Sequence, residues 1–256
     1  MPKITIITVC FNAEQYIEQT IQSVIEQQQV DIEYIIIDGA STDSTKDIIQ
    51  RYESQITHWI SEPDKGIADA MNKGVALATG EYLMFLNADD YFQTPDAIAV
   101  ANSYMGEGKD IYIYDTIFLK KEGGIRRHSG TFGKRINFKG ICHQGTLCKR
   151  SLFNRLGGFN VSFKICMDYD FFMRAYRLGA SGENINEVLS VMRDGGISSR
   201  QDWNSLKQRF MEERKVHYAN QKTPLMRLMY AVYWAMYLPY RKVLYVVKQF
   251  LSKETL

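Results

Sequence analysis

The chain has 256 residues, of which 45% are hydrophobic and 23% charged, and its formal net charge is +2. This composition excludes an intrinsically disordered chain, and the small net charge gives no indication of nucleic-acid binding. Six cations and no acids lie between residues 222 and 253, so the rest of the chain carries 25 cations against 29 acids. The basic character therefore belongs to the C-terminal segment.

The four cysteines have neither CxxC pairing nor metal-ligand spacing; they are Cys10, Cys142, Cys148 and Cys166. This spacing indicates reduced, mostly buried thiols in a cytosolic protein. The N-terminal stretch MPKITIITVCF has no small-residue cleavage site, so it predicts a first strand rather than a signal peptide. No stretch reaches the roughly 18 to 20 apolar residues that span a bilayer.

Strands and helices are expected to alternate along the first hundred residues. Apolar, β-branched runs predict strands over residues 4–10, 34–37, 58–60 and 82–86. Asn12 and Gln15 have the spacing of a capping box, which predicts a helix that begins at Asn12. Further helices are expected after the turn 41–43 and over residues 66–78. This alternation indicates βαβ units and a parallel sheet.

The second part of the chain is less regular. Strands are expected over residues 110–119, 140–148 and 184–192, with a charged turn over 120–127. Helices are expected over 151–156, 167–178, 202–218 and, in the basic segment, 225–251. His143 would then lie within a strand, and the glycine-containing stretch 194–200 would form a mobile loop.

Polar residues follow each of the first four predicted strands. Ligands of parallel α/β sheets bind at the carboxyl ends of the strands. The residues at these ends are Thr8, Asn12, Asp38, residues 62–65, Asp89 and Asp90. We therefore expect them to open onto one edge of the sheet and to form a site.

Asp89 and Asp90 directly follow an apolar strand. Two adjacent carboxylates repel each other when they leave water, unless a cation compensates them. Mg²⁺ or Mn²⁺ takes one or two carboxylates together with phosphate oxygens. The alternatives are a metal or ribose contact and a solvated acidic turn, and the position after a buried strand favours the first.

Weaker signals surround this pair. Asp38 before Gly39 is either a ribose or base acceptor or an ordinary turn pair. Lys65 and Gly66 precede a helix N-terminus, which suits phosphate but also a simple surface turn. Asn72, on the same helix, is either a site residue or a polar-face residue.

The second part of the chain supplies candidates for an acceptor site. Asp168 and Asp170 open a predicted helix, where acids complement the helix dipole, and either one is also placed to act as a general base. His143 is either a core histidine or a contact of an acceptor, and its neighbour Gln144 adds to the second interpretation.

Taken together, these segments resemble one family. TVCFN (8–12), IIIDGASTDST (35–45), DKGIADAMNKG (64–74) and GEYLMFLNADD (80–90) resemble the nucleotide-sugar-binding half of the family-two glycosyltransferases. ICHQGTLCKRSLFNRLGGF and MDYDFFMRA resemble the acceptor half of that family. The resemblance covers about residues 3 to 200, in matching order. It implies an α/β GT-A fold, a Rossmann-like αβα sandwich with a mostly parallel central sheet. The helix expected over 225–251 adds a C-terminal helical extension to this fold.

The resemblance also implies the roles of individual residues. It places Asp168 as the catalytic base of an inverting displacement, and Asp89 with Asp90 as ligands of a divalent metal, Mn²⁺ or Mg²⁺. His143, Gln144 and Asp170 would face the acceptor. The implied donor site, for a nucleotide sugar with UDP favoured, comprises Thr8, Val9, Asn12, Asp38, Lys65, Gly66, Asn72, Asn87, Ala88 and Asp89.

Two positions depart from the family pattern. Asn87 replaces the first aspartate of the metal-binding Asp-x-Asp, and Met167 replaces the glutamate that often precedes the base. These departures leave open a catalytically silent sugar-nucleotide-binding subunit. A sugar nucleotidyltransferase is the other alternative, but Cys10-Phe11-Asn12 stands where such an enzyme has a glycine-rich phosphate loop.

The C-terminal segment is expected to lie on a membrane surface. It combines seven aromatic residues between 225 and 251 with a purely basic charge complement, which is typical of an interfacial helix. A helix packed on the protein or at a dimer interface is the alternative. We therefore predict a GT-A domain over 1–218, with halves 1–100 and 101–218, and a tail over 219–256. The tail would attach the protein to the inner face of the cell membrane, near a lipid-linked glycan acceptor.

Overall fold

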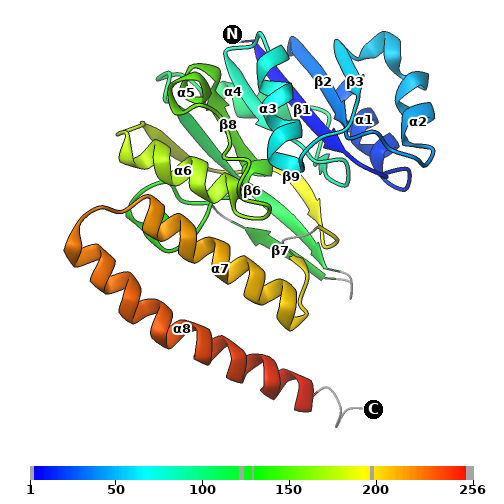
Figure 1. Ribbon diagram of the computed structural model, residues 1–256. Coiled ribbons are helices and arrows are strands. Elements are labelled where there is room, and N and C mark those ends of the chain that lie inside the picture. The colour runs from blue at the N-terminus through cyan, green and yellow to red at the C-terminus, as the bar shows by residue number, and fades with distance from the viewer. Residues whose placement is uncertain (1–2, 121–123, 129, 197–198, 252–256) are drawn as a thin grey trace. The chain divides into compact units, whose positions relative to one another are not determined.

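The structure is a computed structural model that describes residues 3–120, 124–128, 130–196 and 199–251 (Figure 1). Its internal contacts divide the chain into two units, Met1–Gly195 and Gly196–Leu256. The division falls before the boundary at residue 218 that the sequence suggested, because the helix expected over 202–218 makes its contacts with the C-terminal helix.

The first unit is built on one sheet with nine strands among the described residues. The strand order is β3-β2-β1-β4-β8-β6-β9-β5, and β7 pairs with β6. The strands are β1 (Ile4–Cys10), β2 (Ile32–Asp38), β3 (His58–Ser61), β4 (Tyr82–Phe85), β5 (Tyr91–Phe92), β6 (Ile111–Lys120), β7 (Gly124–His128), β8 (Thr146–Lys149) and β9 (Gly182–Arg193).

Most of the strands run in one direction. β1 pairs in parallel with β2 and β4, and β2 pairs in parallel with β3. β8 is antiparallel to both β4 and β6, and β9 is parallel to β6, so β6 and β9 run the same way as β4. The carboxyl ends of six strands therefore meet at one edge of the sheet. This confirms the predicted mostly parallel α/β architecture.

Helices cover both faces of the sheet (Figure 1). The core of one face includes side chains of α1 (Ile17–Ile25), α2 (Thr45–Arg51) and α4 (Ala97–Ser103). On the other face lie α3 (Ile67–Leu77), α5 (Arg150–Leu156) and α6 (Met167–Arg177), with Phe85 of β4 packed on Phe153 and Phe159. Short 3-10 helices occur at Glu53–Gln55, Lys134–Asn137 and His143–Gly145.

Three local predictions are wrong. Asn12 does not cap a helix: it has a positive φ of 50°, and α1 begins only at Ile17. The strand expected over 140–148 begins at Thr146, and His143 lies in a 3-10 helix instead. The turn expected over 120–127 is strand β7 from residue 124 onward, whereas residues 121–123 lie outside the described ones.

The second unit is a pair of helices, α7 (Trp203–Ala219) and α8 (Pro224–Leu251). Asp202 caps α7 by accepting a hydrogen bond from the amide of Ser205. Between the helices His217 is buried, accepts a 3.0 Å hydrogen bond from Trp234 Nε1 and stacks on Tyr230. Burial lowers the pKa of His217 to about 4, so this contact is made by the neutral ring. No helix in the described ranges is long and apolar enough to cross a bilayer.

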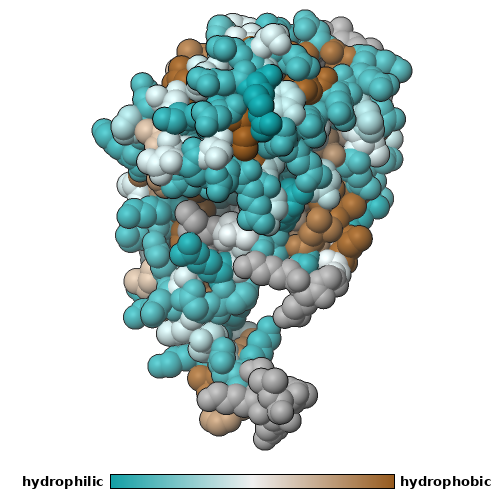
Figure 2. Space-filling view, turned by 90° about the vertical axis from the view of Figure 1, so that its right-hand side faces the viewer, coloured by the Kyte–Doolittle hydropathy of each residue, from teal (hydrophilic) through white to brown (hydrophobic). Residues whose placement is uncertain are grey.

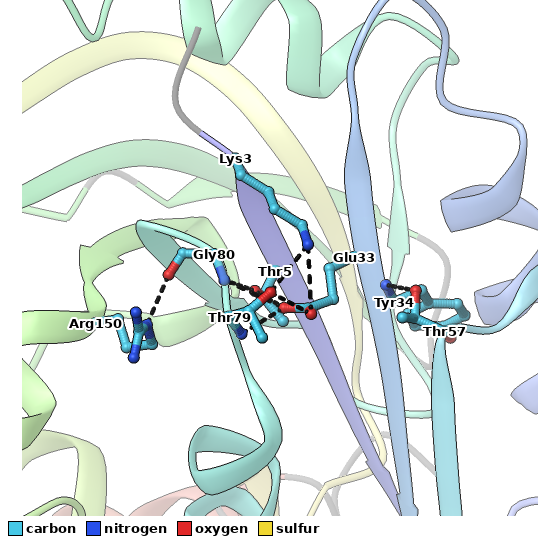
Figure 3. Close-up of polar contacts among 8 residues, drawn as sticks. All are labelled: Lys3, Thr5, Glu33, Tyr34, Thr57, Thr79, Gly80 and Arg150. Carbon is cyan, nitrogen blue, oxygen red and sulfur yellow. Dashed lines mark hydrogen bonds and ion pairs between the residues drawn. The ribbon is translucent and has the colours of Figure 1, made fainter.

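A buried carboxylate ties the amino ends of the strands together (Figure 3). Glu33 of β2 is 3% exposed and accepts hydrogen bonds from Thr5 Oγ1 (2.5 Å), Thr79 Oγ1 (2.6 Å) and the amides of Thr79 and Gly80. Lys3 lies 3.6 Å away, and Arg150 donates to the carbonyl of Gly80. Burial opposes ionisation of Glu33, but the hydrogen bonds outweigh it and lower its pKa to about 2.

An amide side chain joins the two halves of this unit. Asn72 of α3 donates from Nδ2 to the carbonyl of Phe159 and accepts from the amide of Phe159, both at 2.8 Å. Gly158 precedes this contact with a φ of +75°, and a Cβ atom on it would lie 2.5 Å from Asn72 Oδ1. Arg174 of α6 donates to the carbonyls of Leu156 and Gly158. Glycine is therefore required at 158 by both conformation and space.

We predict that Glu33→Gln destabilises the protein by about 2–3 kcal/mol at pH 7, because it replaces a charged acceptor in a buried network. The depressed pKa of Glu33 contributes stability that is fully present above its unfolded pKa of about 4.5 and is lost as pH falls toward 2. The deficit of the variant should therefore shrink below pH 4 in urea unfolding. Glu81→Gln, at an exposed position, is the control, and equal effects of the two changes would contradict this account.

We predict that Gly158→Ala is more destabilising than Gly157→Ala. Both glycines have a positive φ, so both changes introduce backbone strain of about 1 kcal/mol. A Cβ at 157 meets nothing within 4 Å, whereas a Cβ at 158 displaces Asn72 from its two hydrogen bonds, which adds about 1–2 kcal/mol. Urea midpoints that coincide for the two variants would show that Asn72 does not need this space.

Candidate active site

Asp38 ends β2 at the carboxyl edge of the sheet but is fully buried. Its Oδ2 accepts hydrogen bonds from the amide of Ser41 (3.0 Å) and from Ser61 Oγ (2.6 Å). Its Oδ1 accepts from Ser41 Oγ and lies 3.6 Å from Cys10 Sγ. The carboxylate thus connects the ends of β1, β2 and β3, and both oxygens already have donors within the chain.

The loop after β1 is bound to the loop after β2. The backbone amide of Asn12 donates to Ser41 Oγ (2.8 Å), and the side-chain Oδ1 of Asn12 accepts from the backbone amide of Thr42 (2.9 Å). Thr8 points into the core, where its hydroxyl lies 3.1 Å from that of Tyr34, and Val9 is also buried. Thr8 and Val9 were expected in the donor site, but their side chains are buried and do not face the solvent at this edge.

One aromatic side chain at this edge was missed by the sequence analysis. Phe11 is 62% exposed directly after β1. A Cβ on Gly39 would lie 3.5 Å from Phe11 Cδ2 and 2.5 Å from Asp64 Oδ2. The side chains of Phe11 and Asp64 therefore both lie next to the backbone of Gly39. An exposed aromatic ring offers a stacking surface for a nucleobase. An aromatic residue just past the first buried strand was the available signal.

The N-terminus of α3 is occupied by its own carboxylates. The amide of Lys65 donates to Asp69 Oδ2 (3.0 Å) and the amide of Gly66 to Asp64 Oδ1 (2.7 Å). A phosphate would have to replace these acceptors to bind the two amides. The side chain of Lys65 is exposed. Asn72, farther along α3, is engaged by Phe159 as described above.

The segment after β4 forms a tight turn, in which the amide of Asp90 donates to the carbonyl of Asn87 (3.0 Å). Asp90 is 1% exposed; Gln144 Nε2 donates to its Oδ2 (3.1 Å) and the amide of Arg193 to its Oδ1 (3.2 Å). Asp89 is partly exposed and Ala88 is buried. The two adjacent carboxylates therefore differ: one is held inside the protein, and the other opens toward the edge.

Burial raises the pKa of both carboxyl groups. For Asp90 the neighbouring charge of Asp89 raises the pKa further, and the shift is large; for Asp89 a backbone hydrogen bond and the nearby guanidinium of Arg193 act in the opposite direction. A desolvated, partly open carboxylate of this kind favours a bound cation.

The ligands for such a cation are present only in part. Asn87 Oδ1 is buried and has no hydrogen-bond partner among the described residues, so an amide oxygen is available two residues before Asp89. Asp90 has both oxygens engaged. The described residues contain no group of three or more His, Cys, Asp or Glu side chains that could hold a metal by themselves. The donor set fits a cation held by Asn87 and Asp89 and completed by oxygens of a ligand.

Arg193, at the end of β9, fixes this turn. Its Nη1 donates to the carbonyl of Asp89 (2.5 Å), its Nη2 to Gln19 Oε1, and its guanidinium lies 4.7 Å from the ring centroids of both Tyr16 and Tyr91. The chain after it also passes the turn, because a Cβ on Gly195 would lie 3.9 Å from Asp89 Oδ2. Of the loop expected over residues 194–200, residues 197 and 198 lie outside the described ones.

Asp168 is placed at the start of α6 and is partly exposed. Its Oδ1 accepts from the amide of Tyr169 (2.7 Å), and its Oδ2 lies 3.3 Å from Nδ1 of His143. The other ring nitrogen of His143 is buried without a partner among the described residues. A carboxylate that is oriented but still partly open has the geometry required of a general base.

Gln144 and Asp170, which were expected to face the acceptor, are both buried and have partners within the chain. Gln144 is 3% exposed, and its Oε1 accepts from Cys142 Sγ while its Nε2 donates to Asp90. Asp170 is 2% exposed and pairs with Arg174 at 2.7 Å. The 3-10 helix His143–Gly145 thus joins two parts of the edge, because His143 contacts Asp168 and Gln144 contacts Asp90.

Solved structures of glycosyltransferases have this architecture. The chain superposes on Staphylococcus aureus TarS 1–349 in complex with UDP-GlcNAc with a TM-score of 0.67 at 18% identity, covering 85% of this chain and 66% of that one. The mannosyltransferase PcManGT from Pyrobaculum calidifontis, in complex with GDP-Man and Mn²⁺, gives a TM-score of 0.67 at 18% identity over 93% of this chain and 71% of that chain. The fold is therefore that of the GT-A glycosyltransferases, as the resemblance implied, although the chain spans about two thirds of the TarS fragment.

Curated relatives agree with this assignment. A PGL/p-HBAD biosynthesis glycosyltransferase of Mycobacterium bovis is 33% identical over 208 residues, 77% of this chain and 80% of the relative. An uncharacterized glycosyltransferase of Mycobacterium tuberculosis is 34% identical over 212 residues, 78% of this chain and 79% of the relative. The family profile described as glycosyl transferase family 2 matches residues 5–183. The chain belongs to glycosyl transferase family 2.

Proposed function

We propose that the protein transfers a sugar from a nucleoside-diphosphate donor to an acceptor hydroxyl with inversion at the anomeric carbon. The observation that carries the proposal is the 3-10 helix His143–Gly145. Its Gln144 holds the Asp90 side of the turn after β4, and its His143 contacts Asp168. One segment therefore links the turn that carries Asp89, a carboxylate suited to a cation, with Asp168, a carboxylate suited to proton transfer.

The donor would bind where the loops after β1, β2 and β3 meet. Phe11 would stack on the base, and Asp38 would order the surrounding loops through Ser41 and Ser61 rather than contact the ribose. The exposed side chain of Lys65, in the loop after β3, would approach the phosphates. UDP is the favoured nucleotide because TarS is solved with UDP and with UDP-GlcNAc. GDP is the alternative, because PcManGT is solved with GDP-Man.

Asn87 and Asp89 would hold a divalent metal, Mn²⁺ or Mg²⁺. The unpartnered amide oxygen of Asn87 and the desolvated carboxylate of Asp89 fit this role, and the substitution of the first aspartate by Asn87 lowers the charge of the site but keeps an oxygen ligand. When bound, the metal would neutralise the charge that develops on the leaving diphosphate. Asp90 would support the turn rather than bind the metal.

The chemical step follows from the position of Asp168. As the acceptor oxygen forms its bond to the anomeric carbon, the bond from that carbon to the diphosphate oxygen breaks, and Asp168 takes the hydroxyl proton. His143 would hold the carboxylate in the orientation needed for this transfer. Attack from the face opposite the leaving group gives inversion.

The acceptor is proposed to be a lipid-linked glycan in surface polysaccharide or glycolipid assembly. The mycobacterial relative is named for PGL/p-HBAD biosynthesis, which supports a cell-surface product. The basic, aromatic helix α8 would keep the protein at the inner face of the membrane, where such an acceptor is reached.

A catalytically silent sugar-nucleotide-binding subunit is the second candidate. Asn87 and Met167 favour it, because both replace carboxylates of the family pattern. The open carboxylate of Asp168 beside His143 favours the enzyme instead.

We predict that Asp89→Ala and Asp168→Asn separate donor binding from transfer. Calorimetric titration of UDP with and without Mn²⁺ should show metal-dependent binding in the wild type and in Asp168→Asn, and loss of the metal effect in Asp89→Ala. Transfer from a donor sugar should fall at least about 100-fold in Asp168→Asn, because the general base is removed. Nucleotide binding without transfer to any acceptor in the wild type would support the silent subunit, and transfer retained in Asp168→Asn would remove that residue as the base.

We predict that His143→Leu lowers kcat about 10-fold with little change in the KM for the donor, because the base loses the group that orients it. His143→Asn should recover most of the loss, since its amide nitrogen can take the place of Nδ1 beside Asp168. His143→Gln, whose amide reaches toward the Nε2 position, is the matched control and should not recover it. Equal kcat values for the Leu and Asn variants would show that the 3.3 Å contact does not orient the base.

A further inference from the structure

Helix α8 carries two different apolar faces. On one face Tyr230 and Trp234 are 0% and 3% exposed and form a core with Leu206 and Phe210 of α7. Arg241 lies over the ring of Phe210, which adds to this contact. The pairing of the two helices therefore already explains this face.

The other face is apolar and exposed along the whole helix. Leu225 and Met236 are each 69% exposed, and Phe250 is 68% exposed. Successive members are separated mostly by three or four residues, so at 3.6 residues per turn they lie on one side of the helix within an arc of about 120°. We call this set the α8 stripe; it consists of Leu225, Leu228, Met229, Val232, Met236, Tyr240, Val243, Val246, Val247 and Phe250.

The charges on the segment decide which partner fits the stripe. Within residues 219–251 there are five cations and no acids, namely Lys222, Arg227, Arg241, Lys242 and Lys248. A second copy of the helix would bring like charges together and would offer no acids to pair with them. The stripe is also broader than the narrow a/d seam of a coiled coil. An anionic lipid surface complements both the apolar width and the positive charge.

The local shape agrees with insertion at a bilayer surface. A shallow groove on α8 is lined by Pro239, Lys242, Val243, Val246 and Val247, so a cation borders an apolar depression. Most of the surface in Figure 2 is hydrophilic, with apolar side chains gathered in a few patches. The helix is 28 residues long but is not apolar enough to cross a membrane.

We propose that the α8 stripe is the membrane-binding surface of this protein and that α8 lies in the plane of an anionic phospholipid surface, with the stripe in the acyl boundary. Lys242, which borders the stripe, contacts the headgroups, and the opposite face stays on α7. This inference specifies the membrane contact that belongs to the proposed function, but it does not depend on the transfer chemistry.

The test uses the full chain and sedimentation with phosphatidylcholine vesicles, with and without phosphatidylglycerol. The wild type should bind the anionic vesicles preferentially, and the double variant Met236→Gln/Val243→Gln should bind them at least about 10-fold more weakly, because two inserted apolar side chains are lost. Ala231→Gln, on an exposed part of α8 outside the stripe, is the matched control and should bind like the wild type. Lys242→Gln should weaken the preference for phosphatidylglycerol.

Circular dichroism, UDP titration and the oligomeric state in solution separate the outcomes. The helical circular dichroism signal should be the same in all variants. UDP titration should also be unchanged, so a failure of donor binding is distinguished from a failure of membrane binding. Wild-type binding to vesicles that the stripe variant retains in full would overturn the proposal. A solution dimer that the stripe variant converts to a monomer would identify a second copy as the partner and would equally overturn it.

Discussion

The hydrogen bond from Gln144 to Asp90 is the contact on which the arrangement of the edge depends. It joins the 3-10 helix His143–Gly145 to the turn after β4 at 3.1 Å, between residues 54 positions apart in the chain. β8, which follows the 3-10 helix, pairs with β4, so the sheet itself brings the two segments together. His143 belongs to the same 3-10 helix and contacts Asp168, so this segment reaches both carboxylates of the edge.

The two adjacent aspartates have different surroundings, which limits the repulsion between their carboxylates. Asp90 is withdrawn from solvent and receives donors from Gln144 and from the backbone of Arg193. Asp89 stays partly open, and its own carbonyl is held by the Arg193 guanidinium between two tyrosine rings. The pKa values of both carboxyl groups are raised because burial disfavours their charged forms, and these contacts offset that effect only in part. A cation bound at Asp89 would offset the rest of that effect, which is why the pair suits a site for a charged ligand.

The sequence predicted the first part of the sheet well because β1, β2 and β4 are continuous apolar runs that the fold buries almost completely. The four strands expected in the first hundred residues are β1 to β4, and the residues after them do lie at one edge. β5 and α4 were not anticipated, since a two-residue strand has no periodicity. The capping box at Asn12 failed because the loop after β2 takes the polar groups of Asn12.

The roles of single residues were harder to predict for a different reason. A polar residue at a strand end is recognised from its neighbours, but whether its oxygens are free depends on distant segments. Asp38 is engaged by Ser61, and Asn72 by Phe159, 87 residues farther along. Asp168 and Asp89 are the expected residues whose carboxylates remain partly open, whereas Thr8, Asp90, Gln144 and Asp170 turn inward. Phe11 was overlooked because an exposed aromatic residue is informative only once its place at the edge is known.

The contacts of Arg193 to the turn after β4 can form only late in chain synthesis. Its bonds to the turn after β4 span 103 and 104 residues, so the segment that carries the aspartates is made long before its supporting cation. Domains emerge from the ribosome with the N-terminal part first, and contacts of such separation close late. The β1–β4 portion can pair while the chain is still growing, but the aspartate turn lacks its Arg193 contacts until β9 has been added. A nascent chain that stops before residue 193 therefore contains every residue of the proposed donor site but lacks the Arg193 contacts to its charged turn.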